Sequence, residues 1–373
     1  MRSLRWLNSS STNALRVLKV GSQSKLRKLQ LRHYDPKTQL RVRASEVHVP
    51  AFPVVDAHAH VGRWFTGPAW AVADVPAFVD QLESAGVRRV FNFDGRWGEE
   101  LEANLDRYDR VYPARFATFC HVNWQLLLTA DADDRLAASV ASSLQAGARG
   151  VKIWKDLGLT IRDSAGRLVM PDDPRLVGIW ETAARLDVPI AIHTADPAAF
   201  FSPVDRYNER LEELLAHPEW SYFGPQFPAF HELVERLEAL VGGNPRTTFI
   251  GLHAGCYAED LQWVDRMLAT YSNFFIDIAA RIAELGRQPR ATRQLMLAHP
   301  DRVLFGTDGI PPHRDLYQIY FRFLQSADEH FPYSWESPPP TGRWPISGVD
   351  LPPELLQAVY GGNADRLVPS VAG

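Results

Sequence analysis

Eight short apolar segments, each closed by polar residues, recur along the chain and constrain its fold more than any other feature. They predict strands over residues 53–58, 87–93, 113–120, 147–154, 188–193, 247–253, 273–278 and 302–308. Helical spacing of apolar residues predicts helices over residues 77–84, 134–144, 176–186, 230–241, 260–271 and 292–298. Nearly continuous apolar strands that alternate with amphipathic helices are typical of a parallel sheet covered by helices. Eight such strands favour an α/β fold closed into a (β/α)8 TIM-type barrel.

The first part of the chain differs in composition from the rest. Residues 1–34 contain no acidic residue, and their basic residues are Arg2, Arg5, Arg16, Lys19, Lys25, Arg27, Lys28 and Arg32. Together with the hydroxyl-rich stretch 9–12, this composition overlaps that of an organellar transit peptide; the alternatives are a disordered or surface-lying extension and a wrongly chosen start codon. We therefore divide the chain into a basic N-terminal extension, residues 1–46, and the predicted barrel, residues 47–373.

The bulk composition excludes several classes of partner. The chain of 373 residues is 46% apolar, and its 40 basic and 44 acidic side chains give a net charge of -4. This balance argues against nucleic acid or an anionic membrane surface as the main partner, and no apolar run approaches the length of a membrane span. Two isolated cysteines, Cys120 and Cys256, suggest a reducing compartment, so we expect a cytoplasmic protein, with organellar targeting left open.

Residues able to bind a metal or to catalyse stand at the ends of the predicted strands, where a barrel carries its chemistry. They are His58, His60, Asp94, His193, His253 and Asp308. His58 and His60 are two positions apart and project to the same face of a strand, so they offer half of a metal ligand set. Taken alone, this pair is equally compatible with one buried core histidine and one loop residue.

Two connections are longer than a barrel needs, and both are rich in aromatic residues. They follow the fifth and eighth strands and cover residues 194–246 and 309–345. Long loops on the catalytic face commonly build a pocket wall or a lid. The alternative is that their aromatic residues pack a subunit interface, so a homo-oligomer is also compatible with this pattern.

The same residues resemble a known family. H-x-H after the first strand, His193 after the fifth, His253 after the sixth and Asp308 after the eighth are similar to the amidohydrolase superfamily. The resemblance is to its single-metal "amidohydrolase 2" branch of hydrolases and decarboxylases. F-G-T-D-G at residues 305–309 and Y-G-G-N-A-D-R-L at residues 360–367 support it, and it covers residues 52–367.

The resemblance implies a ligand set and a catalytic group. His58, His60, His193 and Asp308 would hold one divalent metal ion, and His253 would act beside it. Three imidazoles and a carboxylate suit zinc best and also accommodate manganese or iron; no organic cofactor is expected. In this interpretation Asp308 accepts a proton from the attacking water, and His253 polarises or protonates a substrate oxygen.

Other polar residues near the strand ends have less specific roles. Lys152, Arg281 and Asp94 are candidates for substrate binding, and Asp196 is a candidate hydrogen-bond partner of a ligand imidazole. Lys152 is also compatible with a carboxylated lysine bridging two metals, or with a salt bridge inside the barrel. The alternatives are a salt bridge to Glu284 for Arg281 and capping of the following loop for Asp94.

These residues favour a metal-dependent hydrolase that cleaves a C–O or C–N bond in a small, carboxylated molecule by means of activated water. A metal-dependent non-oxidative decarboxylase of an aromatic or unsaturated acid uses the same ligands and is the alternative. A metal-free barrel that binds a small ligand is the alternative from another class.

Overall fold

The computed structural model describes residues 26–34 and 36–370, except the side chain of Arg32. The chain divides into two compact units, Met1–Arg41 and Val42–Gly373. The described part of the first unit contains one short 3-10 helix, η1 (Leu31–His33). The hydroxyl-rich stretch 9–12 and the basic residues Arg2, Arg5, Arg16, Lys19 and Lys25 of the predicted extension lie outside the described residues. Among the described residues, no helix is both long and apolar enough to span a membrane.

The second unit is built on parallel strands that follow one another around a barrel. They are β1 (Val54–Ala59), β2 (Val87–Asn92), β3 (Phe116–Thr118), β4 (Cys120–His121), β5 (Val151–Ile153), β6 (Ile190–Ile192), β7 (Phe249–Gly251), β8 (Phe274–Asp277) and β9 (Val303–Leu304). Each pairs with its neighbour in parallel, in the orders β1-β2-β3 and β4-β5-β6-β7-β8-β9. Only Phe119 separates β3 from β4, and its backbone N–H donates to the Asn92 carbonyl at 2.9 Å, so the two count as one barrel strand.

Backbone hydrogen bonds join the last strand region to the first. The N–H of Ala57 donates to the carbonyl of Phe305 at 2.9 Å, and the N–H of Asp308 donates to the carbonyl of His58 at 2.8 Å. Gly306 permits this close approach, because a Cβ at that position would lie 2.9 Å from the Cβ of His58. The predicted (β/α)8 fold is thereby confirmed, and β1 and the segment after β9 lie side by side.

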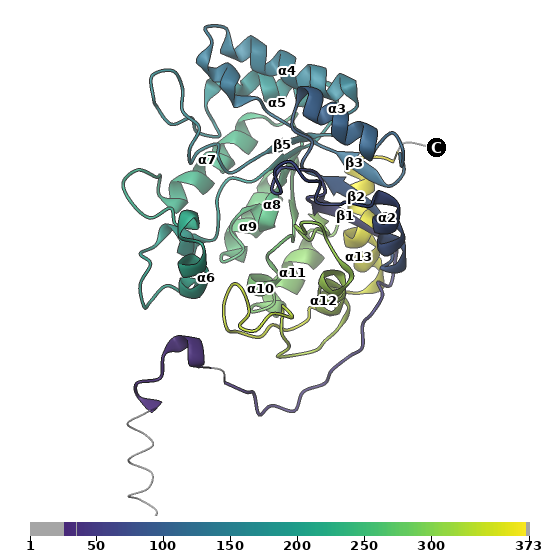
Figure 1. The fold of residues 1–373 in the computed structure, drawn as a ribbon, viewed down its shortest axis with the longest axis vertical. Helices are drawn as coiled ribbons and strands as arrows, with labels where there is room; N and C mark the ends of the chain where they lie inside the picture. The colour runs from purple at the N-terminus through teal and green to yellow at the C-terminus, as the bar shows by residue number, and fades with distance from the viewer. Residues whose placement is uncertain (1–25, 35, 371–373) are drawn as a thin grey trace, which may run out of the picture. The chain divides into compact units, whose positions relative to one another are not determined.

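Helices cover the outside of the strands (Figure 1). The larger ones are α2 (Val75–Ser84), α3 (Gly98–Arg107), α4 (Ala132–Ala146), α5 (Val177–Arg185), α7 (Phe230–Gly243), α9 (Leu261–Thr270), α11 (Pro289–Ala298) and α12 (Arg314–Gln325). The shorter ones are α6 (Leu211–Ala216), α8 (Leu252–Gly255), α10 (Ile282–Leu285), α13 (Pro353–Gln357) and α14 (Asn363–Leu367). Further short turns are η2 (Trp124–Leu128), η3 (Pro174–Leu176), η4 (Ala198–Phe201), η5 (Pro218–Trp220) and η6 (Ala358–Gly362).

Two of the larger helices, α3 and α12, and all five shorter ones were absent from the sequence prediction. In α3, charged residues outnumber the apolar ones, and its apolar contact with the barrel is Leu101 and Leu105. The second long connection, residues 309–345, contains α12. Its residues Tyr317, Tyr320 and Phe321 recur at helical spacing and are buried in the main core. These aromatic side chains therefore pack α12 onto the barrel instead of forming a pocket wall.

The apolar core has one large part between the strands and the helices, a smaller part inside the barrel, and a third cluster around Leu159, Ala195 and Phe230. The interior part includes Val55, Phe91, Phe93 and Phe119, which alternate with outward-facing neighbours along their strands. Phe93 lies at the end of this interior cluster that is nearest the carboxyl ends of the strands, and its ring is 4.8 Å from the ring of His58. The apolar packing inside the barrel thus extends up to His58, at the carboxyl end of β1.

Candidate metal centre

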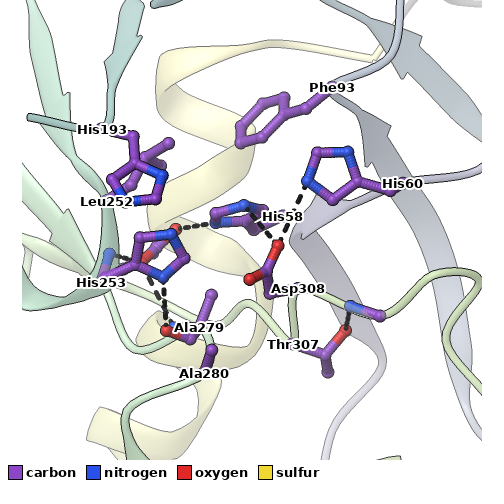
Figure 2. A network of polar contacts seen from close by, with 12 residues as sticks. His58, His60, Phe93, His193, Leu252, His253, Ala279, Ala280, Thr307 and Asp308 are labelled. Atoms are coloured by element: carbon purple, nitrogen blue, oxygen red, sulfur yellow. Dashed lines mark hydrogen bonds and ion pairs between the residues drawn. The ribbon is translucent and has the colours of Figure 1, made fainter. Parts of the chain in front are cut away.

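Four histidines and one aspartate from separate parts of the chain meet at the carboxyl ends of the barrel strands (Figure 2). His58 and His60 come from the end of β1, His193 follows β6, His253 lies in α8 directly after β7, and Asp308 follows β9. Asp308 lies between the first two: its Oδ1 is 3.0 Å from His58 Nε2 and 3.2 Å from His60 Nε2. All four imidazoles are buried.

The ligand atoms of three of these residues are close enough to share one ion. His58, His253 and Asp308 each place one such atom within 4.8 Å of the other two. The ring of His253 lies 4.8 Å from the ring of His58 and 4.4 Å from the ring of His193, measured between centroids. The group that could share one ion therefore contains the predicted catalytic histidine, His253, and two of the four predicted ligands, His58 and Asp308. The other two predicted ligands border this group, His60 beside Asp308 and His193 beside His253.

The nitrogen atoms of the cluster fit a cation. Nδ1 of His58 donates to Asp277 Oδ2 and Nδ1 of His60 donates to Asp94 Oδ1, both at 2.6 Å. In each neutral ring the Nε2 lone pair then faces the Asp308 carboxylate, which is unfavourable unless a positive charge lies between them. Among the described residues, the imidazoles with a buried nitrogen that lacks a hydrogen-bond partner are those of His58 and His60, at Nε2, and His193, at Nδ1.

Carboxylates behind the histidines orient the rings. Asp277, at the end of β8, binds His58 through Oδ2 and accepts the backbone N–H of His253 through Oδ1 at 2.6 Å. Asp94 binds His60 through Oδ1 and the backbone N–H of Gly62 through Oδ2 at 2.9 Å. Both oxygens of Asp94 thus have partners within the protein. Asp277 was not among the predicted site residues. It ends the apolar segment F-F-I-D, and an aspartate at the end of an apolar strand is the same pattern that identified Asp308.

Asp196 lies on the other side of His193. Its Oδ1 is 3.3 Å from His193 Nε2, and its Oδ2 accepts from Lys155 Nζ at 2.5 Å. Because a carboxylate only accepts, the Nε2 of a neutral His193 carries the proton and Nδ1 presents its lone pair. Burial lowers the pKa of His193 to about 3, so the ring is neutral at pH 7.

His253 is held by its backbone and by one ring nitrogen. Its φ of 58° lies in the left-handed region, where the N–H reaches Asp277. Its Nδ1 lies 2.8 Å from the carbonyl of Ala279 and donates to it, so Nε2 carries the lone pair in the neutral ring. Burial holds the pKa of His253 well below its usual range. The neutral ring is therefore an acceptor or a ligand, and a donating role needs protonation.

The charges around Asp308 keep it ionised. Burial raises the pKa of Asp308, but the contacts with His58 and His60 outweigh burial and hold it well below its usual range. Burial lowers the pKa of His60, whereas Asp94 and Asp308 raise it more, to about 9. Both shifts show that this position favours positive charge. The Asp308 side chain is 26% exposed, so solvent reaches the cluster at this carboxylate.

Asp56 fixes the loop that carries Asp308. Its Oδ1 accepts the backbone N–H of Thr307 at 3.0 Å, and its Oδ2 accepts the hydroxyls of Thr307 at 2.6 Å and Tyr317 at 2.9 Å. Asp308 itself adopts a φ of 64°. The buried carboxylate thus ties β1, the loop after β9 and α12 together and sets the direction of the Asp308 side chain.

Two cationic candidates for substrate binding are buried near the cluster. Lys152, on β5, has no hydrogen-bond partner for Nζ among the described residues, and Nζ lies 4.8 Å from the ring of Phe93. Arg281 follows β8 and donates to the carbonyl of Ala280 at 2.8 Å. The alternative salt bridge between Arg281 and Glu284 is not formed, because Glu284 pairs with Arg210.

Aromatic side chains that the sequence analysis did not select surround His60. The rings of Phe65 and Trp154 lie 4.7 Å and 5.8 Å from it, and Trp154 also lies 5.5 Å from His193. Trp64 packs 6.1 Å from Trp154. Trp154 follows the β5 segment V-K-I, so its place at a strand end was the available signal.

Comparisons with solved structures agree with this architecture. An uncharacterised TIM-barrel protein from Bordetella bronchiseptica is 14% identical over 84% of this chain and 97% of that chain, with a TM-score of 0.53. A 2,6-dihydroxybenzoate decarboxylase from Rhizobium is 16% identical over 85% and 98%, with a TM-score of 0.53. A 2,6-dihydroxybenzoate decarboxylase in complex with 2,6-dihydroxybenzoate is 16% identical over 85% and 99%, with a TM-score of 0.54. At these identities the likeness establishes the fold.

The family follows from the sequence. No curated protein matches the chain. The pattern of the amidohydrolase family, in contrast, matches residues 55–369, which include every strand and the whole histidine–aspartate cluster. The chain belongs to the amidohydrolase family, and it is an enzyme of that superfamily.

Proposed function

We propose that this enzyme is a metal-dependent hydrolase that cleaves a C–O or C–N bond in a small, carboxylated molecule. The observation that carries the proposal is the pair of buried imidazole nitrogens, His58 Nε2 and His60 Nε2, that face the Asp308 carboxylate at 3.0 Å and 3.2 Å. A third buried imidazole nitrogen without a partner, His193 Nδ1, belongs to the ring beside His253. Buried polar atoms are rarely left without a partner, and a positive charge is favoured between these nitrogens and the carboxylate. In the metal-free protein a proton on His60 supplies that charge, since the pKa of His60 is raised to about 9, and a bound divalent ion would take the place of this proton.

The proposed ligands are His58, His60, His193 and Asp308. Three imidazoles and one carboxylate suit zinc best and also accommodate manganese or iron. A divalent ion held there supplies a Lewis acid that polarises a carbonyl oxygen and lowers the pKa of water to about 7. His253 lies beside these four residues. Its Nδ1 donates to Ala279, so Nε2 carries the lone pair and could bind the metal as a fifth ligand or contact the substrate.

Asp308 is the proposed general base. It is ionised and is the part of the cluster that solvent reaches. It accepts a proton from the attacking water and passes it to the leaving oxygen or nitrogen as the C–O or C–N bond breaks. Asp277, Asp94 and Asp196 keep the three imidazoles in the orientation that this geometry requires.

Lys152 and Arg281 are the proposed binding groups for the substrate's carboxylate. Both are buried cations near the cluster, and neither has a carboxylate within 4.0 Å among the described residues. An anionic substrate group would complete their charge pairing in a poorly hydrated site, where such pairs are strong. Burial lowers the pKa of Lys152 to about 8, and the ammonium form still predominates at pH 7.

A non-oxidative decarboxylase of an aromatic acid is the second candidate. The rings of Phe65 and Trp154 beside His60 form a wall suited to a planar substrate. One structural relative is a 2,6-dihydroxybenzoate decarboxylase bound to its aromatic acid. In that reaction the C–C bond to the carboxylate breaks, CO2 leaves and a proton is delivered to the ring carbon.

Metal content tests the ligand set. Protein purified without chelators is analysed for divalent metals as wild type, His193→Ala, His253→Ala and His299→Ala. We expect His193→Ala to lose metal and turnover, and His253→Ala to keep metal while losing turnover. His299→Ala is the matched control, because His299 pairs with Asp265 outside the cluster. Full metal and full rate in His193→Ala would refute the ligand set. Absence of metal from the wild type, with none taken up on titration, would favour the metal-free ligand-binding barrel.

Product analysis separates the two reactions. The metal-loaded enzyme is incubated with lactones, amides and aromatic carboxylic acids, while acid production and CO2 release are followed together. We expect acid production without CO2. Release of CO2 without hydrolysis would overturn the hydrolase and establish the decarboxylase.

A further inference from the structure

We propose that the protein has a second cation site, for a monovalent ion of the size of K⁺ or NH4⁺, away from the histidine cluster. The site is a cavity of about 280 Å³ lined by Glu209, Glu259, Glu284, Arg287 and Gln288. The proposal does not depend on the function proposed above, because none of these residues belongs to the histidine–aspartate cluster.

Two carboxylate oxygens at this cavity lack partners. Oε1 of Glu259 accepts the backbone N–H of Ala198 at 2.9 Å, and Oε1 of Glu284 pairs with Arg210. The second oxygen of each, Oε2, is buried and has no hydrogen-bond partner among the described residues. Glu284 is only 3% exposed. An unpaired buried carboxylate oxygen is costly, so each of these two needs a partner in the cavity, and we assign them a shared cation together with water.

The atoms that face this cavity suit a hard cation. Gln288 donates its Nε2 to the carbonyl of Ala258 at 2.6 Å, which leaves its amide oxygen as the free end. Carboxylate and amide oxygens are ligands for alkali and alkaline-earth ions, and no thiol or imidazole lines the cavity. The cavity also has room for an ion together with several waters of about 30 Å³ each.

The local charge balance selects a single positive charge. The carboxylates are Glu209, Glu213, Glu259 and Glu284, and the guanidiniums are Arg210, Arg281 and Arg287. Four negative groups against three positive ones leave one excess negative charge. A divalent ion would overcompensate it beside three arginines, whereas a monovalent ion neutralises it. A single proton shared by Glu259 and Glu284 would also neutralise it, and this is the competing explanation.

The position of the cavity gives a bound ion a structural consequence. Ala198 lies on the connection that follows His193, Glu259 lies between α8 and α9 shortly after His253, and Glu284 lies in α10 shortly after Arg281. The hydrogen bond from Ala198 to Glu259 already joins the first two connections. An ion bound by both Glu259 and Glu284 would connect the third connection, which carries Glu284, to the other two. It would therefore stabilise three loops that lead from the histidine cluster.

Thermal unfolding of the purified protein at constant ionic strength tests the site. The melting temperature is compared in 100 mM KCl, NH4Cl, NaCl and choline chloride, since choline is too large to be bound by two carboxylates. A site with a dissociation constant of a few millimolar should raise the melting temperature by about 2 °C in K⁺ or NH4⁺ relative to choline. Equal melting temperatures in all four salts would overturn the proposal. A separate measurement with CaCl2 at the same ionic strength that raised the melting temperature, while KCl did not, would also overturn it.

A pair of matched variants assigns the effect to the cavity. Glu259→Gln removes the charge and should abolish the difference between K⁺ and choline. Glu212→Gln removes a carboxylate that pairs with Arg343 at 2.6 Å and does not line the cavity, so the difference should persist. A K⁺ response that survives in Glu259→Gln refutes the site.

Crystallography of the wild type tests the same site without any substitution. Crystals soaked in Tl⁺ should show anomalous density between Glu259 and Glu284. Absence of density there, with a melting temperature that changes with pH but not with the cation, would establish the shared proton instead.

Discussion

Replacement of Asp277 by asparagine should weaken metal binding without removing a ligand. Asp277 is fully buried and acts only as an acceptor: Oδ2 binds His58 Nδ1 at 2.6 Å, and Oδ1 binds the backbone N–H groups of His253 at 2.6 Å and Ala279 at 3.2 Å. Asparagine has the same shape but a single acceptor oxygen. Whichever way its amide faces, the NH2 group meets a donor, either His58 Nδ1–H or the N–H of His253.

The size of the effect follows from these contacts. One buried donor loses its partner, which costs about 1–3 kcal/mol in stability. Loss of the carboxylate behind a ligand imidazole typically lowers metal affinity about 10- to 100-fold, which corresponds to about 1.4–2.8 kcal/mol. We therefore expect Asp277→Asn to fold, to unfold at lower denaturant concentration, and to bind the divalent metal about 10- to 100-fold more weakly.

Competition with a chelator measures the metal dissociation constant, and denaturant unfolding of the metal-free protein measures stability. Asp328→Asn is the matched control, because Asp328 is equally buried and its partners Ser45 and Arg322 do not belong to the cluster. It should lose stability on a similar scale and keep its metal affinity. Unchanged metal affinity in Asp277→Asn would show that His58 is not a ligand oriented by this carboxylate.

Three further predictions follow from the structure. Burial lowers the pKa of Lys152 from 10.5 to about 8, so the unfolded chain binds the proton of this lysine more tightly than the folded protein does. Lys152→Met should therefore stabilise the metal-free protein at pH 7 by about 3 kcal/mol. The increase in the denaturant midpoint that measures this gain should vanish above about pH 10.5. Burial lowers the pKa of His121 from 6.5 to about 4, so about 3 kcal/mol of stability should be lost as the pH falls from 6.5 through 4, and a His121→Gln variant should show a flatter stability–pH curve. Gly306→Ala places a Cβ 2.9 Å from that of His58; it should cost about 1–3 kcal/mol and weaken metal binding, which the same two measurements will reveal.

The order of apolar strands and amphipathic helices was sufficient to predict the barrel. Each strand is marked by its own residues, as in V-P-I-A-I-H before His193 and T-T-F-I-G-L-H before His253. Parallel strands bring their carboxyl ends to one edge, so residues at those ends were expected to meet. The helix α3 escaped prediction because its burial rests on few apolar residues. The aromatic residues of α12 were assigned to a loop because their helical spacing was not recognised.

The sequence by itself determined the fold, the family and a short set of candidate site residues, because all three rest on local patterns of strand, turn and polar residue. Only the tertiary structure decided which other residues hydrogen-bond to these site residues and orient them. Asp277 contacts His58 from 219 positions away, and Tyr317 contacts Asp56 from 261 positions away. The cavity between Glu259 and Glu284 likewise exists only where three connections meet. Such contacts depend on the closure of the barrel, and no periodicity within one segment encodes them.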